Sequence, residues 1–149
     1  MTVLREVVET RLPQPSAFAF LADFANAGRW DPGVASSEAV DDTPVGIGKR
    51  YRLGVRMQGR VSPMEYVITD YQPASRVVLT GQGAGVRAVD TIELEPGAHG
   101  GTRITYTADI RLAGLLGLVQ PFLGGAFRKI ARDAMDGMRG ALDRMADSR

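Results

Sequence analysis

The C-terminal part of the chain carries a helical hydrophobic pattern that follows a long run of short alternating segments. From Gln120 to Asp147, apolar residues recur at steps of three and four, which predicts one long amphipathic helix. Its expected apolar face comprises Leu123, Phe127, Ile130, Ala134, Met138, Ala141 and Met145. The strands before it would otherwise leave one apolar face of a sheet uncovered. We therefore expect the helix to lie across a curved sheet and to enclose a cavity with it.

The segments before this helix alternate apolar and polar residues with the period of a β-strand. Strands are expected at residues 3–12, 34–40, 49–58, a stretch through Met64 that ends near Pro73, 76–81, 86–95 and 102–112. Residues 15–23 and 23–28 predict two short helices after the first strand. Short turns between consecutive strands favour antiparallel pairing. The predicted fold class is α+β: a curved seven-stranded antiparallel sheet around a long C-terminal helix, in a single domain over residues 1–149.

Composition excludes several classes of partner. The chain has 18 basic and 17 acidic residues and a net charge of +1, so no strong overall field favours nucleic acid or an anionic membrane. It has no cysteine, which excludes disulfides and thiolate sites and fits a reducing cytoplasm. The N-terminus lacks a signal-peptide pattern, and the longest apolar stretch, 113–123, is too short to span a bilayer. We expect a cytoplasmic protein that does not insert stably into membranes or bind nucleic acid.

Two features of the sequence resemble parts of functional motifs, but we interpret both as parts of turns. His99 is the only histidine and lies in a glycine-rich turn, which argues against a Ser-His-Asp triad or a two-histidine metal site. The run Gly81–Gly85 superficially resembles a phosphate loop, but it joins two strands and no helix follows it. We therefore predict a hairpin turn at Gly81–Gly85, and no metal ion or other cofactor.

The order of these elements is accompanied by several characteristic corners. They are Pro13-Gln14-Pro15, the run Phe18–Asp23, the run Trp30–Val34, the break at Pro73 and the run Gly100–Tyr106. With them the whole chain resembles the START-like, birch-allergen-like (SRPBCC) superfamily, and within it the bacterial polyketide cyclase/dehydrase group. The resemblance implies a helix-grip fold with a deep cavity for lipids, polyketides or other apolar small molecules. It identifies no catalytic residue, because the matching motifs are structural corners.

Asp90 is the polar residue that the pattern singles out. The alternation of residues 86–94 places it among inward-facing apolar positions, where burial raises the pKa of a carboxyl group toward the range useful for acid or base chemistry. Asp90 is therefore the candidate catalytic residue. Two structural alternatives are a bulge after Gly85 that turns the side chain outward and a position at a wet cavity mouth.

Three tyrosines, Tyr51, Tyr66 and Tyr106, are expected on the same inner face, where their hydroxyls can bind a ligand carbonyl. The other candidate ligand-binding residues are apolar or aromatic and come from the strands, the corner after the short helices, and the long helix. They are Trp30, Leu53, Val55, Ile92, Phe122, Phe127, Ile130, Ala134 and Met138. A filled core explains the same residues, and Trp30 in particular suits a packing anchor.

Two glycines interrupt the predicted helix, and each costs about 1 kcal/mol of helix propensity relative to alanine. Gly137 flanks the apolar face, which predicts a close approach to the sheet, whereas no packing reason is evident for Gly140.

Three functions remain open at this stage. The first is binding or transport of a hydrophobic small molecule, such as a lipid or polyketide, without chemistry. The second is a polyketide cyclase or dehydratase, in which Asp90 moves a proton and a tyrosine orients a carbonyl group. The third is a protein-interaction module that uses the apolar segment Ala113 to Leu123, predicted to be a short helix or covering loop.

Overall fold

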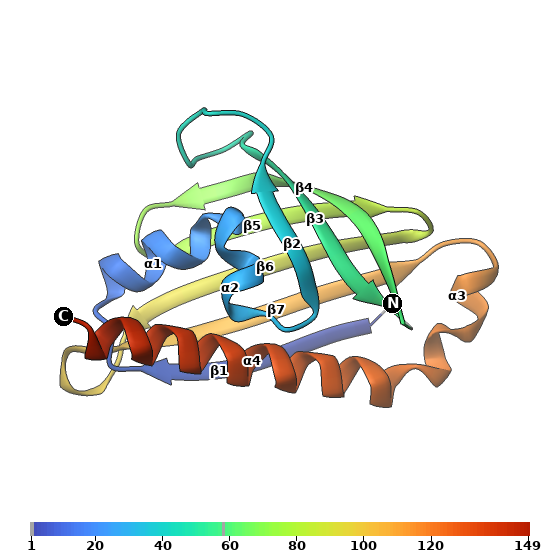
Figure 1. Cartoon of the computed structure of the whole chain (residues 1–149). Helices are drawn as coiled ribbons and strands as arrows, with labels where there is room; N and C mark the ends of the chain where they lie inside the picture. The colour runs from blue at the N-terminus through green and yellow to red at the C-terminus, as the bar shows by residue number, and fades with distance from the viewer. Residues whose placement is uncertain (1, 58) are drawn as a thin grey trace.

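Among residues 2–57 and 59–149, which the computed structural model describes, seven strands form one antiparallel sheet in the order β1-β7-β6-β5-β4-β3-β2 (Figure 1). The strands are β1 (Thr2–Thr10), β2 (Val34–Ala39), β3 (Arg50–Met57), β4 (Arg60–Gln72), β5 (Arg76–Gly83), β6 (Val86–Pro96) and β7 (Thr102–Leu112). The α-helices are α1 (Gln14–Ala22), α2 (Ala27–Trp30), α3 (Leu115–Val119) and α4 (Gly124–Asp147). Short 3-10 helices are η1 (Phe24–Asn26), η2 (Ala98–Gly100) and η3 (Gln120–Phe122). The predicted fold class is confirmed.

The sheet is strongly curved, and β2 and β3 run steeply across β6 and β7 in Figure 1. Register shifts between Val34 and Ser36 and between Ile68 and Asp70 mark irregularities in the ladder that help to bend it. The β5–β6 and β6–β7 ladders are continuous, so the alternation along β6 turns Asp90 to the concave face. The alternative of an outward-turning bulge after Gly85 is therefore wrong.

Helix α4 lies along the concave face, where it packs against β1 and α2 (Figure 1). Its buried residues are Phe127, Ala134, Met135, Met138, Ala141 and Leu142. Helix α1 adds Phe18 and Leu21 to the same core. Sheet, α1, α2 and α4 thus share one apolar interior, which holds the helix across the strands.

Several predicted boundaries are wrong by a few residues. Strand β1 ends at Thr10 and does not reach Leu12, because the Thr10 hydroxyl accepts a hydrogen bond from the Leu12 amide and the chain turns there. Helix α4 begins at Gly124, four residues after the predicted start, because residues 120–122 form a separate 3-10 turn around Pro121. Gln58, the last residue of the predicted strand 49–58, lies outside the described residues.

The close approach predicted at Gly137 is real, but its partner is not the sheet. A Cβ atom at this position would clash with the carbonyl oxygen of Trp30, at the end of α2. At Gly140 a Cβ atom would meet only the end of the Arg144 side chain, at 3.2 Å. The first glycine is therefore required by packing against α2, and the second is not.

The segment between β7 and α4 projects from the body of the molecule (Figure 1). It contains the predicted short helix, α3, but its leucines are largely exposed and it does not act as a cover. In the part of the chain that the structure describes, no helix combines the length and apolar character needed to cross a bilayer.

Candidate functional site

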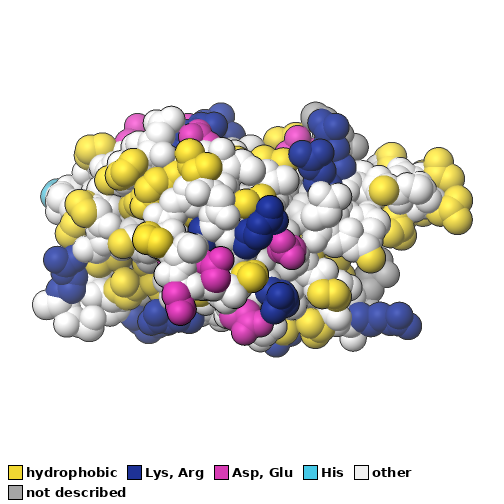
Figure 2. Space-filling model, turned by 90° about the horizontal axis from the view of Figure 1, so that it is seen from above, with side chains coloured by type: hydrophobic (Ala, Val, Ile, Leu, Met, Phe, Trp, Pro, Cys, Tyr) yellow, Lys and Arg dark blue, Asp and Glu magenta, His cyan; other side chains and the backbone are white. Residues whose placement is uncertain are grey.

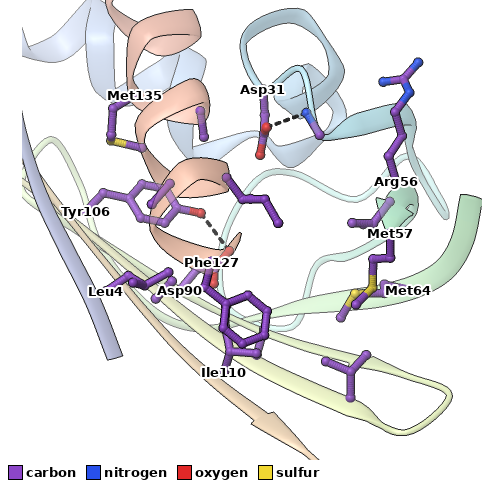
Figure 3. A pocket seen from close by; sticks show the side chains of 18 of the residues that line it. Leu4, Asp31, Arg56, Met57, Met64, Asp90, Tyr106, Ile110, Phe127 and Met135 are labelled. Carbon is purple, nitrogen blue, oxygen red and sulfur yellow. Dashed lines mark hydrogen bonds between the residues drawn. The ribbon is translucent and has the colours of Figure 1, made fainter. Parts of the chain in front are cut away.

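A cavity of about 180 Å³ lies between the sheet and the first half of α4 (Figure 3). Apolar side chains from β1, β3, β4, β6, β7 and α4 form most of its wall. Six polar or charged residues also line it: Glu6, Asp31, Arg56, Tyr66, Asp90 and Tyr106. The cavity is therefore an apolar chamber with a small number of groups that can orient a ligand.

Small side chains explain why this part of the interior is hollow. Ala88 on β6 and Ala108 on β7 face Ala131 and Ala134 on α4 across the cavity. Where helix and sheet both present methyl groups, their side chains cannot meet at the usual separation of packed layers. Because the rest of the sandwich fixes that separation, space remains between them.

Asp90 and Tyr106 form the polar centre of the cavity. Asp90 pairs with Ala108, and Tyr106 pairs with Ile92, so the two side chains are diagonal neighbours on adjacent strands. The Tyr106 hydroxyl donates a hydrogen bond of 2.7 Å to Asp90 Oδ2, and Figure 3 shows this contact beside Phe127. The second carboxyl oxygen, Oδ1, has no protein partner recorded among the described residues, which leaves it available to a ligand.

Burial raises the pKa of Asp90 to about 7. Removal from water disfavours the charged carboxylate and is the largest cause, the hydrogen bond from Tyr106 opposes it, and the negative charge of Asp31 adds to the rise. Burial and the nearby Asp90 charge also raise the pKa of the Tyr106 hydroxyl well above its usual value. Asp90 can therefore exchange a proton near neutral pH, whereas Tyr106 stays protonated and positions it.

Asp31 is a second carboxyl group at the cavity, on the opposite side from the sheet (Figure 3). Its Oδ1 accepts a 2.8 Å hydrogen bond from the Gly33 amide, which fixes the side chain in the turn after α2. Burial raises the pKa of this carboxyl group as well, and the bond from Gly33 opposes the rise. Sequence reasoning missed Asp31 because the Asp-Pro-Gly run predicts a structural corner, and nothing in it indicates which way the carboxylate points.

The cavity reaches the surface beside Ile130, which lines it and is nevertheless 49% exposed. Arg56 also lines the cavity, and its guanidinium donates a 2.8 Å hydrogen bond to the carbonyl oxygen of Pro32 and points away from the interior (Figure 3). Met57 and Met64 complete this side of the wall. Flexible methionines beside an opening can adapt to ligands of different outline.

The structure separates the predicted ligand-binding residues into two groups. The cavity is lined by Tyr66, Tyr106, Val55, Phe127, Ile130 and Ala134, together with the candidate catalytic residue Asp90. Buried in the filled core outside this lining are Tyr51, Trp30, Leu53, Ile92 and Met138. Phe122 belongs to neither group, because it lies on the projecting segment and is 85% exposed.

Two of the residues outside the cavity support it indirectly. Trp30 packs edge-on against the ring of Tyr106, with ring centres 6.0 Å apart, and so helps to hold that tyrosine beside Asp90. Phe24 makes a similar contact with Tyr66, at 5.2 Å. Trp30 is thus a packing anchor, as the sequence suggested, and it anchors a residue of the site.

Among residues 2–57 and 59–149, no cluster of three or more histidine, aspartate or glutamate side chains is placed to hold a metal ion.

The chain matches a known protein family over nearly its whole length. Residues 1–147 match the family described as polyketide cyclase / dehydrase and lipid transport. A search of curated proteins gave no match.

Solved structures share the fold at low sequence identity. A protein of Thermus thermophilus is similar with a TM-score of 0.78 and 17% identity, covering 99% of this chain and 100% of that one. A START superfamily protein of Mycobacterium smegmatis gives 0.72 and 16%, covering 98% and 97% of the two chains. The ZhuI aromatase/cyclase of a Streptomyces species gives 0.75 and 14%, covering 97% and 95%. These similarities establish the START-like fold and leave the reaction open.

Proposed function

The chain belongs to the polyketide cyclase / dehydrase and lipid transport family, and from this premise we propose that it binds a small apolar molecule carrying a carbonyl or hydroxyl group in the cavity beneath α4. The observation that carries the proposal is the combination of an apolar wall with one polar centre, Asp90 and Tyr106. An apolar body fills such a chamber, and the polar centre fixes its orientation.

The size of the cavity restricts the ligand. Its volume of about 180 Å³ is below the ~300–1,000 Å³ of common small-molecule sites. A ligand of one or two rings, or a short acyl chain, suits this space better than a long multi-ring polyketide. The opening beside Ile130 allows part of a longer chain to remain outside.

Native mass spectrometry of freshly purified protein tests the proposal, because a bound ligand adds a discrete mass. Uptake of the neutral apolar dye N-phenylnaphthylamine provides a second measurement. Ala108→Phe places a benzyl group in the cavity and should abolish both signals. Thr107→Phe is the matched control, because the neighbouring side chain points to the other face of β7. Equal binding by both variants would show that the ligand site lies elsewhere.

Proton transfer is the second candidate function, and the pKa of Asp90, about 7, favours it. As a carboxylate, Asp90 can take the proton from the carbon beside a ligand carbonyl. As a carboxylic acid, it can return a proton to a departing hydroxyl. The electrons of the broken C–H bond then form a C=C bond, water leaves, and the carboxyl group regains its starting state. This sequence is the dehydration step of a cyclase or dehydratase.

Asp90→Asn separates the two candidates. The amide keeps the shape and can accept the Tyr106 hydrogen bond, but it cannot carry the proton. For an enzyme, dehydration of a small β-hydroxy ketone, followed by mass spectrometry, should fall by at least about 100-fold in the variant, with binding retained. For a carrier, the wild-type protein takes up the compound and returns it unchanged. Conversion at the wild-type rate by Asp90→Asn would remove Asp90 from the mechanism.

We place this activity in the cytoplasm. The absence of cysteine throughout the chain supports that location, because the chain contains no group whose pairing would require an oxidising compartment.

A further inference from the structure

The segment between β7 and α4 exposes a cluster of large apolar side chains that the cavity does not use. We call this cluster the apolar tip, and it consists of Leu115, Leu116, Leu118, Val119 and Phe122. Leu118 is 71% exposed and Phe122 is 85% exposed. Hydrophobic side chains gather on the projection at the right of Figure 2, which corresponds to α3 in Figure 1. A contiguous apolar projection of this kind marks an interaction site.

The base of the tip is fixed by a buried amide. Gln120 donates hydrogen bonds of 2.7 Å to the carbonyl oxygen of Ile110 and of 2.9 Å to the hydroxyl of Thr2, and it accepts one of 3.0 Å from the amide of Leu112. These contacts join η3 to the ends of β7 and β1. The exposure of the tip is therefore part of the folded structure, because its root is held by specific hydrogen bonds.

In the sequence, basic residues flank the tip on both sides, and no acidic residue lies between them. The 23 residues from Ile110 to Arg132 include Arg111, Arg128, Lys129 and Arg132 and no aspartate or glutamate. The acidic side chains of α4 begin only at Asp133. Arg111 pairs with Asp109 and Lys129 pairs with Asp133, so the excess positive charge of this segment comes from Arg128 and Arg132.

Two hairpins add cations at the same end of the sheet. Leu116 contacts the β5–β6 turn at Gly85, and Arg87 follows that turn on an exposed position of β6. Arg60 is the first residue of β4, at the turn end of the β3–β4 hairpin, and lies beyond the end of β5. Among residues 2–57 and 59–149, no ion pair is recorded for Arg60, Arg87 or Arg128. Their charges are therefore available to an anionic partner.

We propose that the apolar tip docks on an anionic phospholipid surface. Apolar side chains enter the interfacial region of the bilayer while the surrounding arginines contact lipid headgroups, which is how peripheral proteins combine hydrophobic and electrostatic attraction. A second copy of the chain fits less well, because a symmetric tip-to-tip contact would bring the same arginines face to face. The five apolar residues of the tip give reversible surface binding, which differs from insertion across the bilayer.

Docking would also orient the cavity. Phe127 and Ile130 line the cavity on the first two turns of α4, directly after the tip, so the opening lies at the cationic end. If the cavity holds an apolar ligand, as proposed above, this arrangement brings its opening close to the bilayer from which such a ligand can enter. This orientation rests on the proposed function, whereas the docking itself does not.

Co-sedimentation with vesicles tests the docking. Wild-type protein should bind vesicles of phosphatidylcholine with phosphatidylserine, bind much less to phosphatidylcholine alone, and be released by high salt. The double variant Leu118→Asp with Phe122→Asp should lower the partition coefficient at least about tenfold. The matched control is Ile47→Asp, because Ile47 is 72% exposed in the loop between β2 and β3, far from the tip. It should bind like the wild type.

A charge variant tests the second half of the proposal. Arg128→Glu should weaken binding to the anionic vesicles roughly tenfold, whereas Arg144→Glu, at the exposed far end of the same helix, should not. Dye uptake in solution by the tip variant checks that the cavity is intact, so failure of docking and failure of ligand binding remain distinguishable. Absence of vesicle binding by the wild type, or equal binding by the tip variant, would overturn the proposal. The proposal would also be overturned if the wild type formed a dimer that the tip variant abolished and did not bind vesicles.

Discussion

The two halves of the sandwich between α4 and the sheet use the same elements but differ in the size of their side chains. In the filled half, Met138 and Leu142 on α4 and Ile92 on β6 are fully buried. In the hollow half, Ala134 on α4 and Ala88 on β6 occupy the corresponding inward positions and border the cavity. The small side chains of Ala88 and Ala134 therefore help to leave space in the hollow half.

Asp90 and Tyr106 lie where the two halves meet. On β6 the inward residue after Asp90 is Ile92, and on β7 the inward residue before Tyr106 is Ile104, both fully buried. The polar centre is therefore supported by the solid half and exposed to the hollow half. We therefore expect substitutions in the filled half to lower the free energy of unfolding. The polar centre differs, because burial of Asp90 already lowers the stability of the wild-type protein.

The largest effect is expected from Asp90→Asn on the pH dependence of stability. In the unfolded chain Asp90 ionises near its ordinary pKa of 3.8, but in the folded protein its pKa is about 7. Below pH 4 the group is protonated in both states and contributes nothing. Between about pH 4 and 7 the unfolded state releases the proton first, so rising pH lowers the free energy of unfolding by about 4 kcal/mol in total.

Urea denaturation of both proteins from pH 4 to pH 8 measures this contribution. The difference in free energy of unfolding between Asp90→Asn and wild type should shift by about 4 kcal/mol in favour of the variant across that range. A constant cost of burying the asparagine amide cancels in the comparison across pH. Parallel pH profiles would mean that Asp90 is ionised normally in the folded protein, and the polar centre would then lose its role as a proton donor.

Most of the fold follows from the sequence because it depends on periodicity. Alternation along residues 102–112 predicts β7 with its observed bounds, and the three- and four-residue spacing predicts α4. The start of α4 was misplaced because Pro121 is accepted at the beginning of both an α-helix and a 3-10 turn. Local preferences do not decide between these two conformations, whereas the hydrogen bonds of the Gln120 side chain to β7 and β1 favour the observed one.

The residues of the site could be predicted only in part. Alternation along a strand shows which of its faces is buried, but it does not show whether a cavity lies against that face. Asp90, Tyr66 and Tyr106 were placed correctly on the inner face by alternation. Tyr51 and Ile92 share that face but pack into the filled half, since only their three-dimensional neighbours determine whether space remains. Asp31 reaches the cavity from a turn, where no periodicity gives the direction of a side chain.

A pair of truncations on α4 tests the contrast between the two halves directly. Met138→Ala should lower the free energy of unfolding by about 3 kcal/mol, because it removes a fully buried side chain from close packing. Ile130→Ala should cost less than about 1 kcal/mol, because Ile130 is half exposed beside the cavity. Urea denaturation gives both values, and dye uptake should change only for Ile130→Ala. Equal losses of stability would mean that the cavity half is as tightly packed as the other.

The smallest of these effects concerns the two glycines of α4. Their replacement by alanine should change the free energy of unfolding in opposite directions. Gly137→Ala forces a methyl group against the Trp30 carbonyl oxygen, and the strain of about 3 kcal/mol outweighs a gain of about 1 kcal/mol in helix propensity. The net loss of about 2 kcal/mol should also displace Trp30 and, through its ring contact, Tyr106. Gly140→Ala has only the flexible end of Arg144 to move and should stabilise the protein by about 1 kcal/mol.

Thermal unfolding measures both glycine effects, and dye uptake shows whether the Trp30 contact transmits the first one to the cavity. A stabilised Gly137→Ala would mean that α2 can move away from α4 without cost. In that case the filled half would not be the rigid support of the polar centre, and the position of Tyr106 beside Asp90 would depend on their 2.7 Å hydrogen bond. Unchanged dye uptake in a destabilised Gly137→Ala would instead confine the role of Gly137 to stability.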